Sequence, residues 1–85
     1  MGDVALIIKV MPESPDIDLN DIRETIMKTV DNVQQIQEEP IGYGLVALKV
    51  VVVVPDAQGQ TDIVESALNG IKGVERAEII ESTLV

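Results

Sequence analysis

The sequence predicts an α+β fold, a ferredoxin-like βαββαβ sandwich in which two helices cover one face of a four-stranded antiparallel sheet. Strand-like and helix-like segments follow one another in the order strand–helix–strand–strand–helix–strand. The first and third strands are apolar on both faces, whereas the second and fourth are polar. Because apolar strands belong in the middle of a sheet and charged ones at its edges, the predicted strand order is 4-1-3-2.

The central strands are expected at Val4–Met11 and Leu45–Val54. Lys9 is the one charge in the first of them. In the second, the face away from the helices would carry apolar Val51 and Val53 or their neighbours, which indicates a second contact surface, for a partner or a dimer. The valine-rich run also has the composition of an aggregation-prone segment, and both interpretations stay open at this point.

The first helix is predicted from Leu19 to about Asn32, with Asp18 as its N-cap and Lys28 near its C-terminal end. The spacing of three and four residues gives one apolar stripe, made of Leu19, Ile22, Ile26, Val30 and Val33.

The polar segment 33–40 is predicted to form a short edge strand, although it could also extend the first helix. The second helix is predicted to begin after Pro55–Gly59, with Thr61 as N-cap and Asp62 and Glu65 in its first turn. Its apolar stripe is Ile63, Val64, Ala67, Leu68 and Ile71. Residues 74–84 then form the last strand, again polar enough for an edge.

Composition narrows the class of protein. The 85 residues suit a single domain covering 1–85, and the absence of cysteine excludes a disulfide frame. The N-terminus is not that of a signal peptide, and no apolar run approaches the ~20 residues of a membrane span. We therefore expect a soluble cytoplasmic protein that does not bind membranes.

The net charge of −9, with one aromatic residue in the chain, argues against direct nucleic-acid binding. An acidic surface suits a basic protein partner or simply keeps the protein soluble, and charge alone does not separate these two. There is no histidine to activate Ser14, Ser66 or Ser82, so no nucleophile–base pair is available. We expect no enzyme activity, no catalytic residue, no cofactor and no metal site.

Tyr43, the only aromatic residue, lies between Gly42 and Gly44 in the turn before the third strand. In one interpretation its ring packs over the end of the sheet, and the glycines only form a hairpin turn. In the other it is an exposed anchor for a partner, because large rigid side chains dominate interface energetics. The topology places this turn at the end of the sheet opposite the C-terminal Leu84 and Val85.

The segment Pro40-Ile41-Gly42-Tyr43-Gly44-Leu45, with Leu48-Lys49-Val50 and Thr61-Asp62, resembles the guanine-nucleotide exchange domain of the translation elongation factor 1-beta family. The resemblance covers nearly the whole chain, which is similar to the short archaeal members. It implies a ferredoxin-like fold and a protein that binds elongation factor 1-alpha and speeds the release of its GDP.

The resemblance also implies partner-binding residues. Tyr43 matches the aromatic residue that docks on the partner in eukaryotic relatives, within the segment Pro40, Ile41, Gly42, Tyr43 and Gly44. The C-terminus of those relatives reaches the nucleotide site with a lysine next to last, and the matching residues here are Leu84 and the terminal Val85. Leu84 carries no charge, so exchange by this chain is expected to differ from exchange through a lysine.

A different class of function is a regulatory module that senses a small molecule and dimerises through the open face of the sheet. The exchange-factor hypothesis instead predicts a chain that is monomeric when free. Light scattering separates the two.

Overall fold

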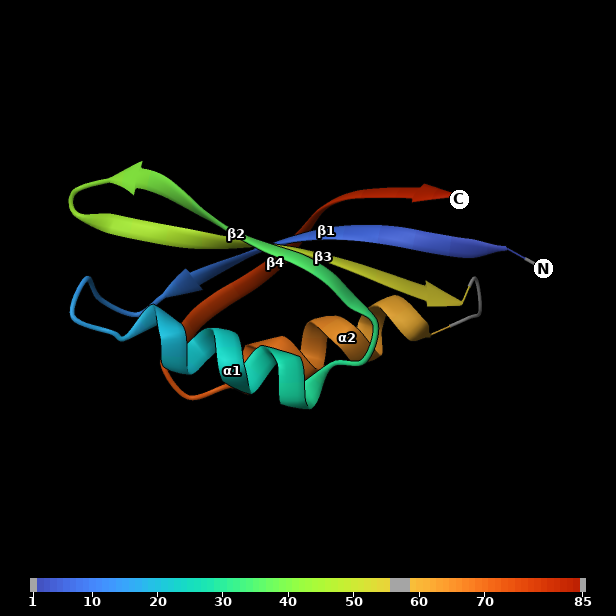
Figure 1. Cartoon of the computed structure of the whole chain (residues 1–85), viewed down its shortest axis with the longest axis horizontal. Coiled ribbons are helices and arrows are strands. Elements are labelled where there is room, and N and C mark those ends of the chain that lie inside the picture. Colours follow the sequence, from blue (N-terminus) through green and yellow to red (C-terminus); the bar gives the residue numbers. More distant parts are fainter. Residues whose placement is uncertain (1, 56–58, 85) are drawn as a thin grey trace.

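A computed structural model describes residues 2–55 and 59–84. The elements run in the predicted order (Figure 1): β1 Asp3–Pro12, α1 Leu19–Thr29, β2 Val33–Gly42, β3 Leu45–Pro55, α2 Gln60–Asn69 and β4 Val74–Leu84. All three strand pairings are antiparallel, in the order β2-β3-β1-β4. This is the predicted order 4-1-3-2 read from the other edge, so the ferredoxin-like α+β fold is confirmed.

The two apolar strands form the centre of the sheet, as predicted. Leu6 lies opposite Val52 and Ile8 opposite Val50, and these four side chains are fully buried. Both helices lie on that face of the sheet (Figure 1) and close the core over it. Val51 and Val53 point the other way and stay partly exposed, which confirms that the open face carries apolar side chains.

Helix α1 begins at the predicted cap, because the Asp18 carboxylate accepts a hydrogen bond of 2.9 Å from the backbone N–H of Asn20. Its buried side chains are Ile22 and Ile26. The predicted C-terminal end near Asn32 is wrong, since the helix ends at Thr29. Val30 is already extended, and Asn32 has φ of 62°, a left-handed conformation that turns the chain into β2.

Helix α2 begins one residue before Thr61, so the prediction of Thr61 as N-cap is wrong. The cap is Gly59, with φ of 86° and no side-chain hydrogen bond. Thr61 and Asp62 lie inside the first turn, whereas Glu65 lies beyond it. The helix buries Val64 and Leu68 against the sheet.

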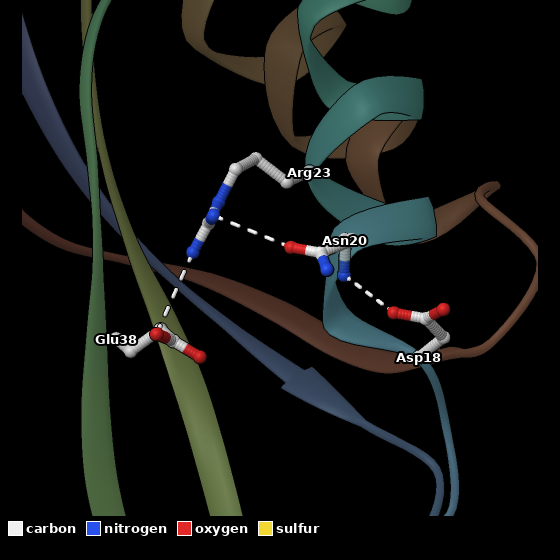
Figure 2. A network of polar contacts seen from close by, with 4 residues as sticks. All are labelled: Asp18, Asn20, Arg23 and Glu38. Atoms are coloured by element: carbon white, nitrogen blue, oxygen red, sulfur yellow. Dashed lines mark hydrogen bonds and ion pairs between the residues drawn. The ribbon is translucent and has the colours of Figure 1, made fainter.

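The polar segment after α1 is a strand and not an extension of the helix. β2 lies at the sheet edge, and most of its side chains are exposed. Arg23 links it to α1 (Figure 2): the guanidinium lies 3.7 Å from the Glu38 carboxylate and donates a hydrogen bond of 3.4 Å to the Asn20 side chain. Asn20 in turn is bonded to Asp18, so the start of α1 is connected to β2, the strand that leads to the Tyr43 turn.

Candidate partner-binding surface

The turn between β2 and β3 consists of Tyr43 and Gly44, flanked by the pair Gly42 and Leu45. Both central residues have positive φ, 55° for Tyr43 and 77° for Gly44, as a type I′ hairpin turn requires. Gly42 also has a positive φ of 105°. Glycine adopts such values at little cost, but tyrosine does not, so the backbone of Tyr43 is in a conformation that is uncommon for its residue type.

The ring of Tyr43 is fully exposed, at 101% of its reference area. This contradicts the interpretation in which the ring packs over the end of the sheet. A large apolar ring presented on a tight turn has the form of an anchor for another molecule.

Pro40 and Ile41 give the approach to this turn its shape. Pro40 lies opposite Val46 and Gly42 opposite Leu45, so Ile41 is an extra residue in β2, a β-bulge. Proline is tolerated here because β2 is an edge strand. Both residues lie beside Tyr43 on the same hairpin, where Pro40 is exposed and Ile41 is half-buried.

The connections that precede α1 and β4 lie at the same end of the molecule as the Tyr43 turn. The backbone N–H of Glu13, in the β1–α1 connection, donates a hydrogen bond of 2.9 Å to the carbonyl of Gly73, before β4. A Cβ placed on Gly44 would lie 4.0 Å from that of Pro15. The Tyr43 turn thus projects from an end of the molecule where three connections meet.

Leu84 lies at the other end of the sheet (Figure 1), opposite Val4 in the register of β1 and β4. Its side chain is 69% exposed. The longest dimension of the molecule is 42 Å, and it runs along the sheet between these two ends. The structure therefore does not bring Tyr43 and Leu84 together. Val85, the other predicted C-terminal residue, lies outside the described residues.

Between the C-terminal end of α1 and the N-terminal end of α2 is a cavity of about 310 Å³. Val30, Ile63 and Val64 give it an apolar side, and Asp31 and Asn32 a polar one. This volume is at the lower limit for a pocket that encloses a small organic ligand. The cavity lies away from the Tyr43 turn.

One feature of the surface was not predicted. Lys9 and Lys49 lie directly opposite each other on the open face of the sheet. The sequence does carry a signal for this pair, because each lysine is the one charged residue within the predicted apolar stretches 4–11 and 45–54. Finding it required the register between β1 and β3, which the sequence pattern alone does not give.

Comparison with known proteins identifies the class to which this fold and surface belong. Residues 5–85 match the model of the EF-1 guanine nucleotide exchange domain, and the chain belongs to this family. The chain is therefore a guanine-nucleotide exchange factor of translation elongation that acts on elongation factor 1-alpha.

Within the family the chain is similar to archaeal proteins named Elongation factor 1-beta. It is 66% identical to the protein of Methanospirillum hungatei over the full length of both chains. Identity is 49% to the protein of Methanothermobacter thermautotrophicus, covering 95% of this chain and 94% of the relative. For Halorubrum lacusprofundi it is 44%, over 93% of each chain.

Proposed function

We propose that the chain contacts elongation factor 1-alpha at two separated places. The first is the Tyr43 turn, with Pro40, Ile41, Gly42 and Gly44. The full exposure of the Tyr43 ring on a backbone of positive φ is the observation that carries this proposal. A bound partner would remove the whole ring from water, and burial of a large apolar ring contributes strongly to association.

The second contact is the C-terminus, Leu84 and Val85, at the opposite end of the molecule. Leu84 is a largely exposed apolar side chain at the end of an edge strand. With no charge it cannot displace a cation from the nucleotide site, so its action is steric. It enters between the loops that hold the nucleotide and keeps them apart.

Exchange follows from differential affinity. A protein accelerates GDP release when it binds the nucleotide-free state of the GTPase more tightly than the GDP-bound state. The two contacts have different roles. The Tyr43 turn supplies affinity for both states of the GTPase, and the C-terminus favours the nucleotide-free state. No covalent chemistry is needed, so the chain acts without being an enzyme and without a cofactor.

Neither α1 nor α2 has the length and apolar character that spanning a membrane requires. We place the chain in the cytoplasm, where it acts as a monomer when free and binds neither membranes nor nucleic acid. The net charge of −9 supports the last point, because a nucleic-acid binder needs a basic surface.

The experiment is GDP release from purified elongation factor 1-alpha, followed with a fluorescent GDP analogue. The chain at micromolar concentration should increase the release rate, and the increase should saturate as the GTPase becomes fully bound. Leu84→Asp should reduce the saturating rate, whereas Tyr43→Ala should raise the concentration needed for half-saturation. If the wild-type chain leaves the rate unchanged, the proposed function is wrong.

A further inference from the structure

The open face of the sheet has two lysines at its centre. In the antiparallel register, Lys9 of β1 is paired with Lys49 of β3. Side chains directly opposite each other in such a pair have Cβ atoms about 5 Å apart and share one face of the sheet. Both lysines are partly buried by their neighbours. Like charges in this arrangement repel each other and destabilise the free protein.

No ion pair offsets this repulsion among residues 2–55 and 59–84, where neither ammonium group has a carboxylate oxygen within 4.0 Å. On the β4 side, Glu78 lies opposite Lys9, but its carboxylate pairs with Arg76 at 3.6 Å. On the β2 side, Lys49 lies opposite the uncharged Gln37. The two ammonium groups are therefore available to a carboxylate from outside.

Apolar side chains follow the two lysines along β1 and β3, while Glu78 and Gln37 flank them on the edge strands. Ile7 lies opposite Val51 in the neighbouring row, and Ala5 opposite Val53 in the row after that. All four are partly exposed, and both helices lie on the other side of the sheet (Figure 1). The centre of the open face thus combines apolar area, which favours association, with two positive charges. Acidic residues of the same face lie on the edge strands: Glu78 and Glu81 on β4, and Glu39 on β2.

This combination indicates the chemistry of the partner. The chain as a whole has a net charge of −9, with six basic residues, so two lysines side by side at the centre of one face form a local exception. Charges that meet across an interface are complementary, so the partner surface is apolar and carries Asp or Glu.

Two other occupants fit less well. Single-stranded nucleic acid binds to sheets through stacking on aromatic side chains, and Tyr43, the one aromatic residue of the chain, is in the turn and not on this face. A second copy of the chain, stacked face to face about a two-fold axis through the lysine pair, would bring four ammonium groups together.

We propose that the open face of the sheet is a further contact surface for elongation factor 1-alpha, in which Lys9 and Lys49 bind carboxylate groups of an otherwise apolar segment of the GTPase. This inference rests on the proposed function. The open face is continuous with the first contact, the Tyr43 turn. Strand β3 leads from that turn to Lys49 within five residues, about 17 Å.

The direct test is zero-length crosslinking of the complex with a carbodiimide, which joins a lysine amine to a carboxylate that it contacts. Mass spectrometry should find Lys9 or Lys49 joined to Asp or Glu of the GTPase. Lys28, an exposed lysine on α1, serves as the internal control and should give few crosslinks to the GTPase.

The affinity test compares a double variant of the open face with a variant of an exposed lysine elsewhere on the molecule. Lys9→Gln with Lys49→Gln should raise the Kd for the GTPase about tenfold, because the facing carboxylates lose their partners. Lys28→Gln should change the Kd by less than about twofold, since exposed charges outside an interface contribute little. Thermal unfolding supplies the folding control: the double variant should be at least as stable as the wild type, because repulsion is removed.

The outcomes separate this inference from the proposed function. If Tyr43→Ala weakens binding and the variant with both Lys9→Gln and Lys49→Gln binds like the wild type, the open face is not a contact surface and the exchange proposal stands. If the wild-type chain does not bind the GTPase, both proposals are wrong. Crosslinks between two copies of the chain, or protection of the lysines by RNA instead of the GTPase, would also overturn the inference.

Discussion

The side chain of Asn69 forms hydrogen bonds with both backbone groups of Ala77, as a neighbouring strand would. At the end of α2, its Nδ2 group donates a hydrogen bond of 3.1 Å to the Ala77 carbonyl, and its Oδ1 accepts one of 2.9 Å from the Ala77 N–H. β4 is an edge strand, so these backbone groups have no further strand to bond. Asn69 satisfies both and fixes α2 against the sheet.

We predict that Asn69→Ala lowers the free energy of unfolding by about 1–3 kcal/mol, the cost of leaving partly buried backbone groups without partners. Urea denaturation measures this. Asn20→Ala, at an exposed position of α1, is the matched control and should change the free energy by no more than about 0.5 kcal/mol. Equal effects of the two substitutions would show that the Asn69 bonds contribute nothing to stability.

Tyr43→Ala should weaken binding to elongation factor 1-alpha by more than about 1 kcal/mol, roughly a fivefold increase in Kd. Titration calorimetry measures the affinity. Tyr43→Phe keeps the ring and should bind nearly as well as the wild type. The free energy of unfolding should not fall in either variant, because the ring packs against no other side chain. An unchanged Kd for Tyr43→Ala would remove the tyrosine from the interface.

Gly44→Ala should destabilise the protein by about 1–2 kcal/mol, because φ of 77° disfavours any residue with a Cβ. Steric contact is not the cause, since the added Cβ would lie 4.0 Å from Pro15. Gly70→Ala provides the contrast. Its φ of −83° suits alanine, and the substitution should leave stability unchanged or raise it by up to about 1 kcal/mol. Thermal or urea unfolding of both variants checks the difference, which would vanish if backbone conformation were unimportant.

The two helix starts should respond differently to loss of a capping side chain. Asp18→Ala should cost about 1 kcal/mol, because it removes the hydrogen bond to the N–H of Asn20. Thr61→Ala should change the free energy of unfolding by less than about 0.5 kcal/mol, since Thr61 lies inside α2 and makes no cap hydrogen bond. A larger loss for Thr61→Ala in urea denaturation would instead support it as the cap.

Features that depend on hydrophobic pattern were predictable from the sequence. The strand order follows because the side chains of β1 and β3 are apolar on both faces, while β2 and β4 carry charge. The stripe that includes Ile22 and Ile26 gave the position of α1, and Asp18 marked its start. These patterns act over whole elements, so one ambiguous residue does not change the outcome.

Features that depend on one backbone angle or on register were not predictable in this way. A threonine before acidic residues has the composition of an N-cap, but the left-handed conformation of Gly59 starts α2 earlier. The chain leaves α1 at Val30, and Asn32 turns it into β2 through a positive φ that its residue type permits but does not demand. The pairing of Lys9 with Lys49, and of Asn69 with Ala77, joins residues far apart in the chain and requires the folded sheet.

The tight turn at Tyr43 has a consequence for the entropy of association. Backbone dihedrals from Gly42 to Gly44 belong to a hairpin whose strands are held by the sheet, so no flexible loop has to become ordered when the ring is covered. Only the two side-chain torsions of the tyrosine lose freedom, at a cost of about 0.5–1.5 kcal/mol. An exposed aromatic ring on a preformed backbone is therefore ready to bind, and most of the free energy gained by burying it contributes to affinity.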